Sequence, residues 1–340
     1  MTPCARRAAV PGAGVLVAVL VLLSAGARGE GAPSLALPID CEIGKSCIVQ
    51  NYVDQDAGPG AQDYRCGLLT YDGHKGTDIR VVDGALFKRG VVVLAAAPGR
   101  VRAVRDGMAD VSVRRIGKAA IARREAGNSV VIEHGDGWES QYAHMREGSV
   151  AVRAGDVVQA GEKLGVVGLS GATEFPHLHF EVRHRGKTVD PFIGLEKRVQ
   201  CQAGEPALWQ RQTIQALAYV PTGVLDAGIA GAPPVVADGF VDRDKIEVFS
   251  SASGAAVFWV QIYGAQANDR EEFRLIAPDG RVLAERHDRI SRNRAQWLAY
   301  VGLRRGDAEW VAGTYRGVYA LSRGPQKLIT LEHASKPVSR

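Results

Sequence analysis

Short runs of β-branched and other apolar residues, separated by glycines, dominate the chain between residues 91 and 182. Such runs are typical of β-strands bounded by turns, and helical periodicity is weak in this part of the chain. The pattern therefore predicts a β-rich domain in which most glycines are turn residues. The strands are expected at residues 91–94, 101–104, 129–133, 157–158, 164–167 and 178–182.

A second set of apolar runs follows residue 240 and predicts an antiparallel, immunoglobulin-like β-sandwich. Its strands are expected at residues 257–263, 272–276, 282–285, 296–301, 313–321 and 327–331. Asp279-Gly280, between two of these runs, is a strong hairpin-turn signal. Four aromatic residues are interpreted as sandwich core rather than as a carbohydrate-binding surface, because aromatics that alternate along strands are mostly buried. They are Trp259, Trp297, Trp310 and Tyr315.

The first 27 residues have the three parts of a secretory signal. Arg6 and Arg7 precede an apolar run at residues 15–23, and small residues follow it. The run is too short to cross a bilayer comfortably, since a spanning helix needs about 20 residues. We therefore expect an exported protein of the periplasm, the cell envelope or the extracellular space, with no membrane span after signal removal. An uncleaved signal that anchors the chain is the alternative.

Charge says little about the partner of this chain. The formal net charge of +5 falls to +3 when Arg6 and Arg7 leave with the signal, which is a weakly basic balance. Such a balance is compatible with an anionic polymer such as a cell wall. Eight basic residues lie between positions 100 and 124, but no aromatic residue is interleaved for base stacking. A solvated face is therefore expected there, and no nucleic acid as a partner.

Four cysteines remain after signal removal, at Cys41, Cys47, Cys66 and Cys201. An even number in an exported chain predicts two disulfides, and the irregular spacing argues against a cysteine metal site. Three pairings are open. Because Cys201 follows the first set of strands and the others precede it, at least one bridge is expected to tie the end of the first domain to its N-terminal segment.

Two histidines, His177 and His179, lie two residues apart in the last strand of the first set. Residues at this spacing point to the same side of a strand, so both imidazoles face one groove. Further upstream, His74 and Asp78 are four residues apart, and His144 stands in a separate motif. Together these residues indicate a zinc hydrolase.

The residue types suit a catalytic zinc ion, which has three protein ligands and an open position for water. His74, Asp78 and one histidine of the pair supply that number. With two neutral imidazoles and one carboxylate, the metal keeps a positive charge, so it can acidify its water and polarise a carbonyl. His144 and the other histidine of the pair are then free to move protons or to stabilise an oxyanion.

These motifs together resemble the lysostaphin-type (LytM-like) zinc metallopeptidases over residues 70–195. The resemblance rests on His74-x-x-x-Asp78, Tyr142-x-His144 and His177-x-His179, with Gly127-Asn128-x-Val130 and His134 between them and Val189-Asp190-Pro191 after them. It implies one zinc ion per chain, bound by His74, Asp78 and His179. It implies His144 and His177 as the catalytic pair. It also implies a mostly antiparallel β domain with a narrow groove, and cross-linking peptides of peptidoglycan as the substrate.

The resemblance completes a plan for an all-β, mainly antiparallel chain. The plan has a signal at residues 1–27, a disulfide-bearing segment at 28–69, the peptidase domain at 70–200, a linker or irregular crossing rich in glycine and proline at 201–239, and the sandwich at 240–340. The segment before His74 is expected to fix that histidine rather than to occlude the groove. One departure from the family concerns residues 172–176, which often form a small glycine-containing stretch. Here Glu174 and Phe175 stand in it, which puts subsite specificity in doubt.

Three functions follow from these features. The leading one is an exported zinc endopeptidase that cleaves peptide bridges of peptidoglycan. The alternative is a non-catalytic activator of other wall hydrolases, but such proteins lack metal ligands and none is missing here. A third hypothesis makes the sandwich a binding module for the wall, for a cell-wall hydrolase or for a divisome partner.

Overall fold

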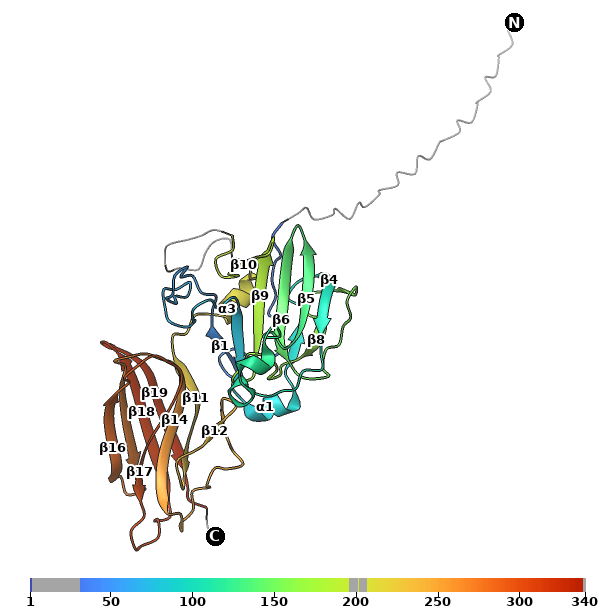
Figure 1. Ribbon diagram of the computed structural model, residues 1–340. Helices are drawn as coiled ribbons and strands as arrows, with labels where there is room; N and C mark the ends of the chain where they lie inside the picture. The colour runs from blue at the N-terminus through green and yellow to red at the C-terminus, as the bar shows by residue number, and fades with distance from the viewer. Residues whose placement is uncertain (2–30, 196–200, 202–206, 339–340) are drawn as a thin grey trace. The chain divides into compact units, whose positions relative to one another are not determined.

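The computed structural model describes residues 1, 31–195, 201 and 207–338, and residues from Ala32 onward form one compact unit. Apart from Met1, the signal expected at residues 1–27 lies outside the described residues. The chain is nearly all β and its sheets are antiparallel, as the sequence predicts (Figure 1). No helix in the described part of the chain is long and apolar enough to cross a membrane.

The first half of this unit is built on an eight-stranded sheet with the order β1-β2-β9-β6-β5-β4-β7, in which β10 also pairs with β9. The strands are β1 (Cys47–Asn51), β2 (Thr77–Val81), β4 (Gly99–Arg105), β5 (Asn128–Gly135), β6 (Trp138–Met145), β7 (Val157–Val158), β9 (His177–His184) and β10 (Lys187–Val189). A separate pair joins β3 (Val92–Leu94) to β8 (Lys163–Val166). The helices are short: α1 (Gly84–Arg89), α2 (Val113–Ile116), the 3-10 helix η1 (Lys118–Ile121) and α3 (Arg211–Ala216).

The two faces of this sheet carry different residues, because apolar side chains and the two histidines alternate along β9. Leu178, Phe180 and Val182 point into the apolar core, where each is at most 1% exposed. His177 and His179 lie on the other face. The expected division of this motif between a packed layer and a groove is therefore confirmed.

The second half contains two facing sheets, which confirms the predicted sandwich. The three-stranded sheet has the order β11-β14-β17, and the four-stranded sheet has the order β16-β15-β18-β19. The strands are β11 (Gly223–Ala230), β14 (Ala255–Ala265), β15 (Arg270–Ile276), β16 (Val282–Arg289), β17 (Arg294–Arg304), β18 (Tyr315–Arg323) and β19 (Gln326–Ser335). A small hairpin joins β12 (Val236–Ala237) to β13 (Phe240–Val241). Phe258 from one sheet and Phe273 and Tyr319 from the other share one apolar core.

Three of the four aromatic residues lie in the sandwich core, as the sequence predicts. Tyr315 is fully buried there, and Trp297 and Trp310 pack against that core, whereas Trp259 is buried in a separate cluster with Ala230 and Val241. Asp279-Gly280 forms the predicted turn between β15 and β16, closed by a bond from the amide of Gly280 to the carbonyl of Ala277. The domain boundaries at residues 70, 200 and 240 stay predictions.

One stretch was misread from the sequence. The region interpreted as a linker or irregular crossing at residues 201–239 contains β11, which pairs along its length with β14. The sequence did not predict β11 because a glycine within a strand, here Gly228, weakens the strand signal. This glycine lies against the ring of Trp259, where an added Cβ would come within 2.8 Å of the ring. The strand therefore needs glycine for packing rather than for a turn.

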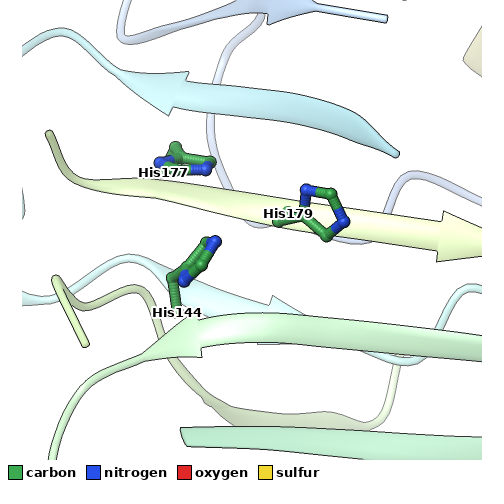
Figure 2. A group of neighbouring side chains, drawn as sticks. All are labelled: His144, His177 and His179. Atoms are coloured by element: carbon green, nitrogen blue, oxygen red, sulfur yellow. The ribbon is translucent and has the colours of Figure 1, made fainter. Parts of the chain in front are cut away.

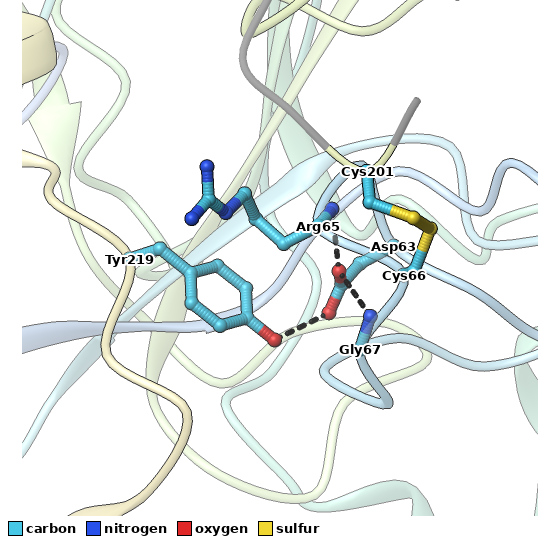
Figure 3. Close-up of a disulfide and its surroundings, with 6 residues drawn as sticks. All are labelled: Asp63, Arg65, Cys66, Gly67, Cys201 and Tyr219. Carbon is cyan, nitrogen blue, oxygen red and sulfur yellow. Dashed lines mark hydrogen bonds between the residues drawn. A yellow bond between two sulfur atoms is a disulfide. The ribbon is translucent and has the colours of Figure 1, made fainter. Parts of the chain in front are cut away.

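The two predicted disulfides are present, and they pair Cys41 with Cys47 and Cys66 with Cys201. The second bridge joins residues 135 positions apart, which confirms the expected tie between the N-terminal segment and the end of the first domain. Beside it, the buried carboxylate of Asp63 accepts hydrogen bonds from the amide of Gly67 and the hydroxyl of Tyr219 (Figure 3). Hydrogen bonds to Asp63 therefore hold the turn that carries Cys66, in addition to the disulfide.

Candidate active site

Three neighbouring strands, β2, β9 and β6, bring the predicted site residues to one face of the sheet. Asp78 on β2 lies directly opposite His179 on β9, and residues opposite each other in an antiparallel pair point the same way. His177 lies on the same side as His179, and His144 reaches toward both from β6 (Figure 2). The rings of His144 and His177 are 4.7 Å apart between centroids. The sheet register therefore gathers four of the five predicted residues.

His144 reaches the groove only because the backbone of β6 is irregular there. Tyr142 points into the core, so simple alternation places Ala143 in the groove and His144 in the core. Instead, Ala143 and His144 together oppose Ser129 alone, which is a β-bulge. His144 adopts a φ of +63°, a conformation that non-glycine residues rarely take. This irregularity turns the imidazole toward the groove.

His74 is held by the segment that precedes it, as the sequence predicts. Its Nδ1–H donates to the carbonyl oxygen of Tyr52 at 2.6 Å, and the ring of Tyr71 packs against it at a tilt, with centroids 4.5 Å apart. The bond fixes the tautomer, which leaves Nε2 as a free ligand atom in the neutral ring. Gly76, two residues after His74, passes so close to His179 that an added Cβ would come within 2.6 Å of that ring. Glycine is therefore required at this position.

Three ligand atoms converge at this point of the groove. The Oδ1 atom of Asp78 lies 3.1 Å from His74 Nε2 and 2.8 Å from His179 Nδ1, and these two nitrogens are 3.3 Å apart. A tetrahedral metal with ligands about 2.1 Å away would separate its ligand atoms by about 3.4 Å. The second oxygen of Asp78 accepts a bond from the side-chain amide of Asn51 at 2.9 Å. The spacing and the supporting bonds fit a bound metal ion.

A second trio, His144, His177 and His179, also lies close enough to hold a metal. We favour the first trio because it combines a carboxylate with two imidazoles, and its three ligand atoms lie within 3.3 Å of one another. In the second trio, His144 donates from Nδ1 to the carbonyl of Ser170 at 2.8 Å, and His177 donates from Nδ1 to the carbonyl of Phe175 at 2.9 Å. These bonds orient both rings through Nδ1, and the Nε2 atom of His177 lies 3.4 Å from Oδ1 of Asp78.

The charges of the site depend on burial and on the histidines around Asp78. Burial opposes ionisation of Asp78, but the charges of His74 and His177 and hydrogen bonds from His177 and His179 outweigh it and hold its pKa well below the usual range. Burial, followed by the neighbouring His177 and His179, lowers the pKa of His144 well below its usual value. The site therefore contains an ionised carboxylate beside a neutral imidazole at pH 7.

A cavity of about 800 Å³ opens beside these residues and is lined by Asp78, His144 and His177. Glu174 and Phe175, the departure from the family pattern, both line it. Phe175 packs on His177 with ring centroids 4.9 Å apart, whereas Glu174 forms an ion pair with Arg114. These two residues therefore shape one wall of the groove.

Other polar residues of the first domain lie outside the converging group. His134 is bound to the carbonyl of Pro98 and to Ser140, and His184 stacks on Trp138. Sequence reasoning missed Asn51, Tyr52 and Ser170, which orient Asp78, His74 and His144. Two of these three act through backbone carbonyls, so no side-chain pattern could have revealed them.

Comparison with known proteins identifies the domain that carries these residues. Residues 72–191 match the family model described as Peptidase family M23. The chain is 34% identical to the Murein hydrolase activator NlpD of Escherichia coli over 126 residues, which are 37% of this chain and 27% of that protein. It is 38% identical to the Peptidoglycan DD-endopeptidase ShyB of Vibrio cholerae over 76 residues, which are 22% of this chain and 17% of that protein. The chain thus spans only about a quarter or less of these relatives.

Among solved structures, the chain is similar to the catalytic domain of the antimicrobial peptidase lysostaphin from Staphylococcus simulans, at 22% identity and a TM-score of 0.28. That likeness covers 42% of this chain and 85% of the lysostaphin domain. The family match confirms the resemblance drawn from the sequence motifs. Residues 72–191 are a peptidase family M23 domain.

Proposed function

We propose that this chain is an exported, zinc-dependent endopeptidase that hydrolyses the peptide cross-links of cell-wall peptidoglycan. The observation that carries the proposal is the convergence of His74, Asp78 and His179, whose ligand atoms lie within 3.3 Å of one another. These three residues hold one zinc ion, and His144 and His177 are the catalytic pair. The M23 match supports a peptidase, and the name of the Vibrio cholerae relative supports the substrate.

In this proposal the two remaining histidines, His144 and His177, handle proton transfer and oxyanion stabilisation. Zinc bound there would supply a Lewis acid and a water of lowered pKa. His144, neutral at pH 7, offers Nε2 as a proton acceptor, because its Nδ1–H is occupied by the carbonyl of Ser170. His177 is oriented in the same way by Phe175. An imidazole that has accepted a proton becomes a donor, which can stabilise an oxyanion and protonate the leaving amine.

The proposal is tested with the exported chain, zinc and defined cross-linked muropeptides. Mass spectrometry of the products should reveal fragments with new amine termini, and their masses identify the bond that is cut. The His179→Ala variant should release none, whereas His287→Ala, an exposed histidine of the sandwich, should behave as wild type. Absence of products from the zinc-loaded wild type would refute the proposal.

The second candidate is a non-catalytic activator of other peptidoglycan hydrolases, and the names of the NlpD relatives favour it. It predicts a folded chain that binds no zinc and cleaves nothing alone, yet increases product release by a partner hydrolase. Zinc content per chain, measured by atomic emission, separates the two. A value near one supports the peptidase, and a value near zero in a folded sample supports the activator.

Export is supported by the two disulfides, since such bridges persist in oxidising compartments. We place the chain in the periplasm or cell envelope, with peptidoglycan as its partner. A wall hydrolase or a divisome protein is a further partner for the sandwich under the second candidate. Fractionation of cells that express the tagged chain, with and without osmotic release, tests this placement.

A further inference from the structure

The sandwich is attached to the sheet of the candidate active site through a buried polar network. Arg80, two residues after Asp78 on β2, is 1% exposed and donates to Gln50 at 2.8 Å. It also donates to the carbonyl of Gly239 and to Gln296 on β17 at 3.1 Å. Breaking such a buried network costs the desolvation of each unpaired group. The network therefore holds the end of β17 beside the groove.

A second contact acts at the same place. The side-chain amide of Gln50, itself 1% exposed, donates to the carbonyl of Ala295 at 2.8 Å. As a result, the cavity that contains Asp78, His144 and His177 has a further wall from the sandwich. That wall comprises Gly264, Ala265, Gln266, Asn293, Arg294 and Ala295. These residues lie outside the M23 match at residues 72–191.

Arg294 is the cation of this wall, and its charge has no partner there. Its Nε is buried and lacks a hydrogen bond, and the guanidinium carbon lies 5.8 Å from the centre of the Trp297 ring. Among the described residues, no carboxylate forms an ion pair with it. The neighbouring ring of Trp297 restricts the side chain, so less entropy is lost when it binds an anion.

The other charged groups of the cavity are already occupied or exposed. Glu174 is paired with Arg114 at 2.6 Å, and Glu125 accepts from the amide of Arg123 at 2.9 Å. Asp78 belongs to the converging group, and Lys118 is an exposed lysine. Arg294 is thus the group best placed to recognise an anionic part of a ligand, and its planar fork suits a carboxylate.

We infer that the C-terminal sandwich forms one wall of the substrate groove and that Arg294 binds a carboxylate of the peptide substrate. The inference rests on the peptidase function proposed above for the same groove. Peptidoglycan stem peptides carry free carboxylates, which gives the charge complementarity. Arg294 is a specificity-determining residue in this arrangement, and Arg80 is a positioning residue that holds its wall.

The test compares Arg294→Ala and Arg294→Lys with Arg304→Ala in the full chain. Arg294 and Arg304 are the first and last residues of β17, and Arg304 is exposed and outside the cavity. The probes are a cross-linked muropeptide dimer with free carboxylates and the same dimer with those carboxylates amidated. Equilibrium binding is measured in a His177→Ala background, so that turnover does not interfere, and hydrolysis is measured separately. Thermal melting verifies that each variant is folded.

We expect Arg294→Ala to weaken binding of the free-acid dimer about 10- to 100-fold, the range for a charged hydrogen bond. Arg294→Lys should retain part of the affinity, the amidated dimer should bind all variants equally, and Arg304→Ala should match the parent. Equal affinities of Arg294→Ala and its parent for the free-acid dimer would overturn the inference, as would a parent that binds neither dimer. Binding that depends on Arg294 without any hydrolysis would refute the peptidase proposal and leave the inference standing.

Discussion

The M23 domain and the C-terminal sandwich are both built from antiparallel sheets, but they treat buried charge in opposite ways. In the sandwich, Asp269 forms two bonds of 2.9 Å with the guanidinium of Arg323, and Glu271 accepts from Trp297 and Tyr319. In the groove, Asp78 instead faces imidazole nitrogens, with its Oδ1 3.1 Å from His74, 3.4 Å from His177 and 2.8 Å from His179. A buried acid that accepts hydrogen bonds from N–H and O–H donors stabilises a fold. A buried acid surrounded by imidazole nitrogens is suited to binding a metal ion.

The largest expected effect comes from removing a ligand of the groove. His179→Ala should lower hydrolysis of cross-linked muropeptides by about ten-thousand-fold or more, because it removes one of three metal ligands. Zinc content should fall below one per chain, while the circular dichroism of the sheets stays unchanged. His333→Ala in β19 is the matched change in the sandwich and should alter neither quantity. A His179→Ala variant with normal zinc content would contradict the proposed ligand set.

The two disulfides are expected to stabilise the folded chain to different extents, because they close loops of different length. Replacing Cys66 and Cys201 by serine opens a loop of 135 residues and should lower the free energy of unfolding by about 5 kcal/mol. Replacing Cys41 and Cys47 opens a loop of six residues and should cost about 2 kcal/mol. Urea unfolding of both double variants measures the difference. Equal losses would show that strain or local contacts, rather than loop closure, determine their effect.

A buried acid without a cation should make the M23 region sensitive to pH. Burial raises the pKa of Asp190 from 3.8 to about 7, against hydrogen bonds from Phe192 and Gln55. The folded chain thus holds this proton more tightly than the unfolded chain. The contribution of Asp190 to the free energy of unfolding is therefore largest below pH 4 and is lost as the pH rises to about 7.

Asp190→Asn should remove this dependence and should gain up to about 4 kcal/mol over wild type at pH 8. Urea unfolding of the metal-free chain between pH 4.5 and 8 measures it. The comparison is with Asp269→Asn in the sandwich, which should instead lose stability because it breaks the pair with Arg323. Parallel curves for wild type and Asp190→Asn would show that the carboxyl is not protonated in the folded chain.

An effect as small as that of the Cys41–Cys47 bridge is expected from Glu271 in the sandwich. Glu271→Ala leaves the buried donors of Trp297 and Tyr319 without their acceptor and should cost about 2 to 3 kcal/mol in the free energy of unfolding. Zinc content should stay at its wild-type value, because the residue contributes only to the core of the sandwich. A loss of zinc in this variant would show that the core of the sandwich also affects metal binding in the M23 domain.

Much of this arrangement could be predicted from the sequence. The alternation of Leu178 and His179 predicted both the packed layer and the groove, because a strand has a fixed period of two. The hairpin at Asp279-Gly280 and the bridge from Cys201 followed from turn chemistry and from the even number of cysteines. Each of these features depends on residues close in sequence or on a strict local rule.

The remaining features depend on contacts that local rules do not contain. The bulge that turns His144 into the groove depends on its pairing with Ser129, and β11 is a strand because Gly228 fits against Trp259. The position of Arg80 under the sandwich depends on Gln296, which is 216 residues away. Such long-range pairings are determined by packing, so the motifs alone could not predict them.

The bridge between Cys66 and Cys201 has a further consequence for how the chain responds to proteolysis. His74, Asp78, His144, His177 and His179 all fall between these two cysteines, so the entire proposed site belongs to one covalent ring. A single cut by a foreign protease within the ring leaves both pieces joined. Such a nicked chain would migrate as one band until a reductant is added, and its groove would keep every residue that the intact chain has.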